Sequence, residues 1–300
     1  MSTSVRVGTE STATLGGRRE TLISRIARQT GRMGLLFPAV ALMAVFLIGP
    51  IAYSVYGSLT NAALSGYKAA NPEFVGLENY VELLTSNAFW KAVLLTVIFV
   101  FASAVVGQNI LGLALAMLMR KAPKILSTLV GGVVVIAWVM PEIVAAFALY
   151  AFFSTDGTLN VLLSYIGLGG TTWLLTFPMF SVIMANIWRG TAFSMMVYSA
   201  ALAEVPPEIQ EAAKVDGARG WQRFFFVTLP MIKGSISTNL LLTTLQTLGV
   251  FTLLWVMTGG GPGTQSTTLP VMAYQEAFKN SLIGYGTAIA TVTIVLGALF

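Results

Sequence analysis

Two ionisable side chains stand inside long apolar runs, where a charge costs enough free energy to suggest a function. Glu142 lies within residues 125–153 and Arg189 within residues 177–202. Counted from the outer ends of these runs they are 11 and 12 residues deep, which is about 17 Å along a helix at about 1.5 Å per residue. Equal depth permits an ion pair, which would lower the cost of burying both charges. Such a pair would either line a solute path or clamp two helices together, and both interpretations stay open.

Neutral amides, hydroxyls and aromatics also recur within the apolar runs. Amides and hydroxyls can exchange hydrogen bonds with sugar hydroxyls, and aromatic faces can cover the apolar C–H surfaces of a sugar. Each such residue can also hold helices together as polar glue. With the two charged residues they form the candidate substrate path, which consists of Gln108, Asn109, Glu142, Asn186, Trp188, Arg189, Tyr198, Thr243 and Gln246. The small residues Gly107 and Gly112 indicate close helix packing beside them.

The longest polar interruption in the second half of the chain, residues 204–230, has the pattern of a helix, a glycine turn and a second helix. Pro207 suits a first helical turn, and Gly217 is the natural left-handed stop. Ala212 and Ala213 lie on a stripe whose small members would let another surface approach closely. A second short helix then leads into the next apolar run.

These residues must be positioned by helices in a membrane. The chain has 56% hydrophobic and only 10% charged residues, against roughly 25% charged in soluble domains. We therefore expect an all-α integral membrane protein. Crossing a bilayer takes about 20 residues, and six apolar runs have about this length or more: about 34–59, 93–119, 125–153, 177–202, 231–257 and 282–300. The basic tail 1–33 is expected to be partly disordered or to lie at the membrane surface.

The distribution of positive charge predicts the orientation. Segments 1–33, 120–124 and 204–233 hold 6, 3 and 4 of the 17 basic residues, whereas the alternate loops hold 3. Basic residues accumulate on the cytoplasmic side. Both termini and the loop 204–230 are therefore predicted to be cytoplasmic in a multi-pass protein of the plasma (inner) membrane. The sixth run reaches residue 300 without the charges that usually end a span, so we expect the natural chain to continue past it.

The loop 204–230 carries the pattern E-A-A-x-x-D-G-A, followed after ten residues by L-P. It resembles the EAA loop in the membrane subunits of bacterial ABC importers, which are six-helix proteins of type I and in which this loop docks on the ATPase subunit. The matching residues are Glu211, Ala212, Ala213, Asp216, Gly217, Ala218, Leu229 and Pro230. The resemblance implies that coupling to the ATPase is carried by Glu208, Glu211, Ala212, Ala213, Asp216, Gly217, Ala218, Arg219 and Phe224.

The predicted outer loops carry further family phrases. G-G-G-P-G occupies residues 259–263, Y-Q-E-A-F begins at Tyr274, F-V-G-L-E-N-Y spans residues 74–80, and D-G-T-L-N begins at Asp156. A phosphate-binding loop is not indicated, because no G-x-x-x-x-G-K-[ST] occurs. The phrases resemble permeases of the maltose and glycerol-phosphate type, in the carbohydrate-uptake branch. The resemblance implies contact with a solute-binding protein at Thr258, Gly259, Gly260, Gly261, Pro262 and Tyr274.

The resemblance also implies a set of partners. These are a second homologous permease, two ATP-binding subunits, an extracytoplasmic solute-binding lipoprotein, membrane lipid and a sugar, with a disaccharide such as trehalose as the expected solute. No cofactor is expected in this chain, since ATP and Mg would be bound by the partner subunits, and no nucleic acid is expected. ATP-driven closure of the ATPases would move the coupling helices and switch the helix bundle between inward-facing and outward-facing states.

The residue types exclude most enzymatic chemistry. The chain has no histidine and no cysteine, which removes the commonest general base and every thiolate nucleophile or metal ligand. No metal-ligand spacing and no G-x-S-x-G motif appear, so catalysis is assigned to a partner. The alternative functions are an ion-coupled secondary transporter and a channel subunit. A secondary carrier is expected to show relay residues and internal halves, whereas this chain offers one buried acid and one buried base.

Overall fold

The computed structural model describes residues 36–299, so the predicted basic tail, residues 1–33, lies outside the described residues. The chain divides into two units, Met1–Tyr53 and Ser54–Phe300. In the first unit, residues 36–53 belong to an apolar helix, Leu36–Ser58, that is long enough to cross a membrane. A π-helical segment, η1 (Ala44–Ile48), precedes α2 (Gly49–Ser58). Pro50 explains this irregular turn, because proline has no N–H to continue the α-helical hydrogen bonding.

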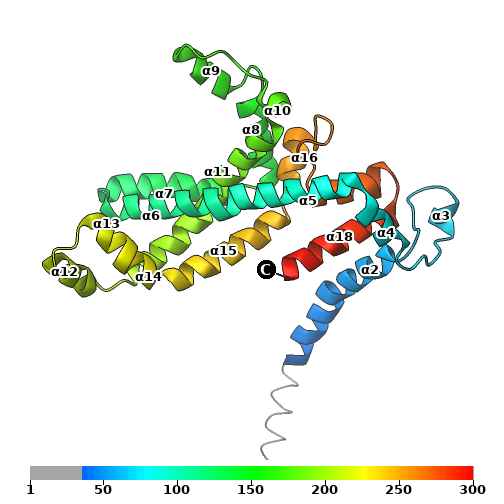
Figure 1. The fold of residues 1–300 in the computed structure, drawn as a ribbon, viewed down its shortest axis with the longest axis horizontal. Helices are drawn as coiled ribbons and strands as arrows, with labels where there is room; N and C mark the ends of the chain where they lie inside the picture. The colour runs from blue at the N-terminus through cyan, green and yellow to red at the C-terminus, as the bar shows by residue number, and fades with distance from the viewer. Residues whose placement is uncertain (1–35, 300) are drawn as a thin grey trace, which may run out of the picture. The chain divides into compact units, whose positions relative to one another are not determined.

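The second unit is a helical bundle, which confirms the predicted all-α class (Figure 1). An isolated β-bridge joins Thr60 to Phe74. The helices of this unit after α2 are α3 (Tyr67–Ala70), α4 (Glu78–Thr85), α5 (Asn87–Val100), η2 (Phe101–Gln108), α6 (Asn109–Lys121), α7 (Lys124–Val139), α8 (Glu142–Phe153), α9 (Thr158–Tyr165), α10 (Trp173–Thr176), α11 (Pro178–Ala203), α12 (Pro207–Val215), α13 (Gly220–Arg223), η3 (Phe224–Thr228), α14 (Leu229–Met231), α15 (Lys233–Leu248), α16 (Thr252–Thr258), α17 (Leu269–Tyr274), η4 (Gln275–Lys279) and α18 (Ile283–Ala298).

Helices occupy all six predicted apolar runs, but two of the runs are broken. The third is interrupted at Pro141, where extended backbone separates α7 from α8. The fifth is interrupted between α15 and α16 at residues 249–251. A further bend of 69° separates Gly220–Met231 from Lys233–Leu248. Prolines and glycines at these places remove or weaken backbone hydrogen bonds, which ends each helix.

Length and composition alone identify fewer spanning helices than the sequence predicts. Leu36–Ser58, Asn87–Lys121 and Glu142–Tyr165 qualify, and the bent pair would make a fourth. The long helix α11 is missing from this set although it has 26 residues. Its polar side chains lower its hydropathy, yet many of them are buried inside the bundle. Six crossings therefore stay a prediction.

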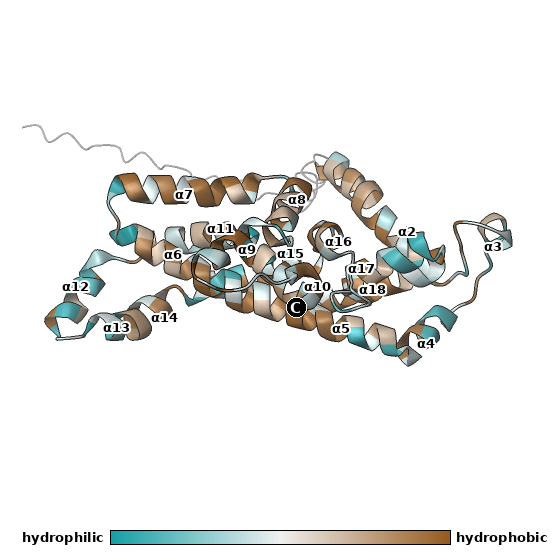
Figure 2. Ribbon diagram, turned by 90° about the horizontal axis from the view of Figure 1, so that it is seen from above, coloured by the Kyte–Doolittle hydropathy of each residue, from teal (hydrophilic) through white to brown (hydrophobic). Residues whose placement is uncertain are grey.

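Helix α11 is the central element of the second unit. It contacts α6, α7, α8, α15, α16 and η2, and it lies side by side with α6 and α7 (Figure 1). Apolar clusters pack on both halves of it: Val182 and Ala185 contact residues of α8 and α16, and Met195 and Leu202 contact residues of α6. In the ribbon of Figure 2, α5 and α7 are mostly in the brown of hydrophobic residues, whereas α12, at one end of the unit, carries more of the teal of hydrophilic residues.

The predicted close packing at small residues is confirmed. A Cβ added at Gly112 would lie 2.4 Å from the Cβ of Ser194, and one added at Gly107 would lie 2.3 Å from the side chain of Ile187. Both neighbours belong to α11. Gly107 and Gly112 therefore determine how closely the η2–α6 helix approaches α11.

Replacing Gly112 with alanine is expected to destabilise the protein by about 1–3 kcal/mol, as overpacking does, because the new Cβ would also lie 2.9 Å from the Met195 amide nitrogen. Thermal unfolding of the purified protein in detergent measures the loss. Gly132→Ala in α7 is the matched control, since no atom lies within 4 Å of a Cβ there. Equal stability of the two variants would contradict the close packing of α6 on α11.

Candidate functional site

The loop 204–230 folds as its residue pattern predicts. Pro206 has extended backbone and Pro207 begins α12, with Glu208 in the first turn and Lys214 in the last, both favourable to the helix dipole. Gly217 adopts a left-handed conformation with φ +80°. Its amide donates to the Lys214 carbonyl at 3.1 Å, and the next amide, of Ala218, donates to the Ala213 carbonyl at 3.0 Å. This is a glycine-terminated helix end, which fixes the direction of the chain into α13.

Side-chain contacts join the two short helices of this loop into one body. The Gln210 amide of α12 donates to the Thr228 hydroxyl at 2.9 Å. The Gln222 side chain accepts from the Arg219 backbone amide at 2.7 Å, which caps α13. Trp221 contacts Phe226 with ring centroids 6.1 Å apart. Of these contacts, the Gln210–Thr228 hydrogen bond links α12 to the second half of the loop.

One face of α12 is free in this chain. The Val215 side chain is 87% exposed. Six of the predicted coupling residues are exposed: Glu208, Glu211, Ala212, Asp216, Gly217 and Arg219. Ala213, Ala218 and Phe224 are partly buried. Small and acidic side chains thus share an accessible surface, where a partner with basic groups could approach closely.

A buried hydrogen-bond network centred on Asn109 joins α6, α11 and α15. The Asn109 carbonyl oxygen accepts from the Tyr198 hydroxyl, and from the Asn239 amide at 2.7 Å. The Asn109 amide donates to the Ala104 carbonyl at 2.7 Å and to the Thr243 hydroxyl at 3.4 Å. Each of these side chains is 7% exposed or less. In an apolar surrounding such bonds bind the three helices together because no water replaces them.

A second set of hydrogen bonds in the network involves residues of the η2 segment. The Asn186 amide donates to the Ser103 hydroxyl at 2.8 Å and to the Thr247 hydroxyl at 3.4 Å. The Gln108 amide donates to the Asn186 backbone carbonyl at 3.1 Å. Gln108 also packs against Gly190, where a Cβ would lie 2.2 Å from the Gln108 side chain. These bonds therefore join η2, which continues into α6, to α11 and α15.

Seven of the nine predicted substrate-path residues divide into two groups, and the other two, Glu142 and Arg189, are partly buried. Gln108, Asn109, Asn186, Tyr198 and Thr243 are buried in the network. Trp188 is 45% exposed and Gln246 is also exposed. Contact of these residues with a solute stays a prediction. Only the exposed group, Trp188 and Gln246, has side-chain surface open to such contact. Three network members were not predicted from the sequence: Ser103, Asn239, and Ser194, whose hydroxyl accepts from the Asn239 amide at 3.0 Å. The only signal for each is a polar residue within an apolar run.

The ion pair that equal depth would permit between Glu142 and Arg189 does not form. Glu142 begins α8 after the break at Pro141, and its carboxylate accepts from the Leu253 backbone amide at 3.3 Å. That amide lies in the first turn of α16, where free N–H groups favour an anion. The Nε atom of Arg189 is buried without a hydrogen-bond partner among the described residues. Counting depth along straight helices failed because the breaks in the third and fifth runs place a helix start beside Glu142.

The predicted binding-protein residues lie mostly in one turn. Thr258 ends α16, and Gly259 and Gly260 have φ of +60° and +87°. The turn is closed by the Ser266 hydroxyl, which donates to the Thr258 hydroxyl at 2.8 Å, and by the Gln275 amide, which donates to the Gly259 carbonyl at 3.0 Å. The glycines are needed because left-handed backbone strains other residues.

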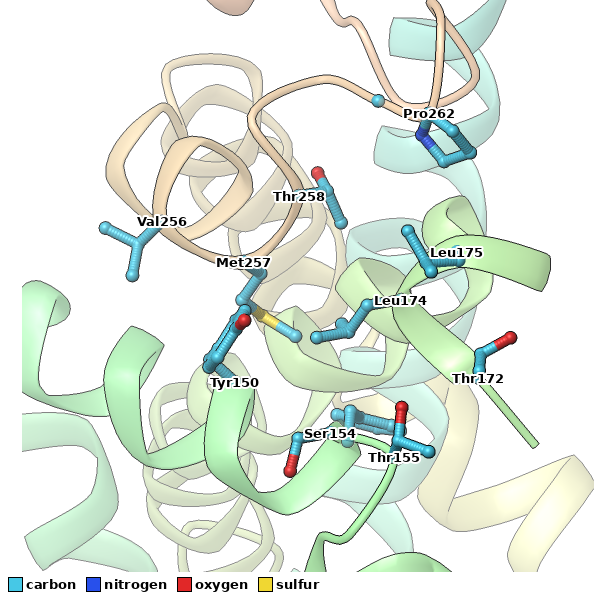
Figure 3. A pocket seen from close by; sticks show the side chains of 12 residues that line it. Tyr150, Ser154, Thr155, Thr172, Leu174, Leu175, Val256, Met257, Thr258 and Pro262 are labelled. Atoms are coloured by element: carbon cyan, nitrogen blue, oxygen red, sulfur yellow. The ribbon is translucent and has the colours of Figure 1, made fainter. Parts of the chain in front are cut away.

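A pocket of about 460 Å³ opens beside this turn and is lined by residues of α8, α10 and α16 (Figure 3). Thr258, Gly261 and Pro262 contribute to it, and the side chains of Tyr150, Met257 and Leu174 lie close together within it.

Tyr274 stands apart from this turn in an aromatic cluster. Its ring centroid lies 4.7 Å from that of Trp255 and 4.9 Å from that of Phe251. The Lys279 ammonium lies 4.5 Å from the Trp255 ring centroid, a cation–π contact. The sequence analysis named Tyr274 alone and missed the cluster, because ring contacts between α16 and α17 follow from tertiary packing. Among the described residues no group of three or more acidic residues is placed to hold a metal ion.

Comparison with known proteins identifies relatives across most of the chain. Residues 108–300 match the family model described as binding-protein-dependent transport system inner membrane component. The trehalose/maltose transport system permease protein MalF of Thermococcus litoralis is 31% identical over 92% of this chain and 93% of its own length. The trehalose transport system permease protein SugA of Mycobacterium tuberculosis is 33% identical over 89% of this chain and 85% of its own. The predicted resemblance to sugar permeases, including the first permease subunit of the mycobacterial trehalose importer, is confirmed.

A solved bacterial alginate ABC transporter, in complex with an alginate pentasaccharide-bound periplasmic protein, contains a chain of the same fold. The TM-score is 0.77 at 24% identity, over 93% of this chain and 94% of that one. At this identity the likeness concerns the fold.

Replacing Asn109 with alanine is expected to destabilise the protein by about 1–3 kcal/mol or more, because the buried Tyr198 hydroxyl and Asn239 amide would lose their acceptor. Gln246→Ala changes an exposed side chain on α15 and is expected to stay within about 0.5 kcal/mol of the original stability. Chemical unfolding of the two purified variants measures the difference. An Asn109→Ala protein as stable as Gln246→Ala would show that the network does not hold the helices together.

Proposed function

The chain belongs to the family of binding-protein-dependent transport system inner membrane components, and on this premise we propose that it is a permease subunit of an ATP-driven importer for a sugar. It would form half of a translocation pathway together with a second, homologous permease. Two cytoplasmic ATP-binding subunits would hold ATP and Mg and hydrolyse the ATP. An extracytoplasmic solute-binding lipoprotein would deliver the sugar.

The observation that carries the proposal is the helix–turn–helix loop 204–230, held by internal hydrogen bonds, with its exposed acidic and small residues. A membrane bundle without a nucleotide motif must receive free energy mechanically, through an element that does not deform. The bonds from Gln210 to Thr228 and across the Gly217 turn give the loop this property. The accumulation of basic residues on this side supports its cytoplasmic placement, with both termini on the same side.

The route of the movement follows from the fold. The loop continues directly from α11 on one side and, through the 69° bend, into α15 on the other. The network around Asn109 joins both helices to α6. A displacement of α12 would thus move the three helices as a group, which fits a switch between inward-facing and outward-facing packings.

A sugar is supported by the relatives and by the chemistry of the chain. Two relatives are named for trehalose or for trehalose and maltose, and a third, SmoG of Agrobacterium fabrum, for sulfoquinovosyl glycerol. We propose a disaccharide such as trehalose as the solute. The exposed Trp188 and Gln246 offer an aromatic face and an amide, the groups that bind sugar surfaces and sugar hydroxyls.

Uptake of radiolabelled trehalose, maltose and an unrelated amino acid into proteoliposomes containing the complete transporter and its binding protein tests the proposal. We expect uptake of a disaccharide that requires ATP, stops with vanadate and is indifferent to ionophores. Uptake that follows an ion gradient would identify a secondary carrier instead, and conductance independent of solute would identify a channel.

Replacing Gly217 with proline is expected to reduce uptake at least tenfold, because proline is restricted to φ near about −65° whereas this residue has φ +80°. ATP hydrolysis should then continue without transport, or the ATPase subunits should dissociate. Asp216→Lys is expected to have the same effect by reversing charge on the exposed face. Gly234→Ala in α15 is the matched control, since no atom lies within 4 Å of a Cβ there. Unchanged uptake in both loop variants would show that the loop 204–230 does not couple ATP hydrolysis to transport.

A further inference from the structure

A cavity of about 390 Å³ lies between the end of α6 and the inner side of the loop 204–230, and it concentrates positive charge. Arg120 and Lys121, the last two residues of α6, line it together with Arg223, the last residue of α13. None of the described residues that line the cavity is acidic. Three cations around one cavity repel one another, so an anion bound there would be stabilised by all three.

Arg223 supplies an independent indication of a missing partner. Its Nε atom is buried, and it has no hydrogen-bond partner among the described residues. A buried donor without an acceptor costs free energy, and the cost is larger for a charged group. The Arg223 residue itself lines the cavity together with Arg120 and Lys121, and a planar guanidinium suits a phosphate in particular.

The rest of the lining is divided between polar and apolar groups. Gln210 and Thr228, which bond to each other, provide polar atoms. Met117, Leu202 and Phe224 provide an apolar wall. A simple inorganic anion has no apolar part that could pack against these side chains. A phospholipid has both a charged headgroup and apolar chains, so the cavity matches its two parts.

The position of the cavity favours a ligand from the membrane. Gln210 lines it from the inner side of α12, whereas Glu208, Glu211 and Val215 are exposed. An ATPase subunit docked on that exposed face would lie on the other side of the helix. Arg120 and Lys121 stand where the apolar run of α6 ends, which is the depth of lipid headgroups.

We propose that this cavity binds the phosphate of an anionic phospholipid from the cytoplasmic leaflet and so fixes the coupling loop to α6. The orientation rests on the proposed function. The phosphate bridges Arg120 and Lys121 on α6 to Arg223 on the loop. Because α12, α13 and η3 contact mainly one another and α14, this bridge adds a polar link from the loop to α6. Coupling of ATP hydrolysis to sugar uptake therefore depends on anionic lipid.

The complete transporter, reconstituted in nanodiscs of phosphatidylcholine with stepwise increasing phosphatidylglycerol, tests this inference. Native mass spectrometry after gentle release counts the bound phosphatidylglycerol molecules, and ATP hydrolysed in response to the loaded binding protein is measured in the same discs. The variants are Arg223→Gln and Arg120→Gln. Lys233→Gln is the matched control, because it removes one charge from the exposed start of α15, on the same side of the protein but outside the cavity.

We expect each cavity variant to weaken phosphatidylglycerol binding about fivefold, the equivalent of about 1 kcal/mol for one basic residue near a membrane surface, and the control to bind as the original does. Equal binding by variants and control would overturn the inference. So would rescue of coupling in pure phosphatidylcholine by inorganic phosphate, which would assign the cavity to a soluble anion. Dissociation of the ATPase subunits from the cavity variants would show that the cavity residues bind the ATPase subunit and not a lipid.

Failure of the proposed function would look different. A transporter that takes up no sugar in any lipid would refute the proposed function, while the count of bound phosphatidylglycerol would still decide whether the cavity holds lipid.

Discussion

The structure depends on hydrogen bonds that are buried where water cannot replace them. Asn109 accepts from Tyr198 and Asn239, so a single amide joins residues of α6, α11 and α15. In an apolar medium an unpaired amide or hydroxyl costs far more than in water, which makes these contacts a requirement for the native packing. Glycines at the same seam let α11 come close enough for the bonds to form. The buried polar residues and the glycines therefore act together to hold α6, α11 and α15 in their native packing.

The hydrogen-bonded packing of these helices explains how a short surface loop could act on a whole bundle. The loop 204–230 is held by its own contacts and is continuous with α11 and α15, two of the three helices that the network joins. A movement applied to α12 reaches helices that cannot slide independently, because each slide would break buried bonds. The cation-lined cavity at the end of α6 lies where a further contact would complete this connection. The proposed coupling would thus rest on hydrogen bonds at two levels, within the loop and within the bundle.

Much of this arrangement could be predicted from the sequence. The apolar runs, the helix–glycine–helix pattern ending at Gly217 and the close packing at Gly112 follow from local chemistry, and the structure has all three. The ion pair of Glu142 with Arg189 could not be predicted correctly, because depth counted along a straight helix ignores the breaks that bring the start of α16 to Glu142. Hydropathy likewise cannot tell whether a polar residue faces a neighbouring helix or a solute path, so it did not separate buried Asn109 from exposed Gln246.

The central claim is that the exposed face of α12 meets an ATPase subunit in the cytoplasm. The chain has no cysteine, so Val215→Cys, at a side chain that is 87% exposed, provides a unique attachment point in this subunit for a photoreactive thiol crosslinker. Tyr165→Cys in α9, at a side chain that is 81% exposed, provides the comparison on the predicted outer side. The account predicts a crosslink to the ATPase subunit from position 215 and none from position 165. Protection of position 165 from a membrane-impermeant thiol reagent, with labelling of position 215 from outside the cell, would contradict it.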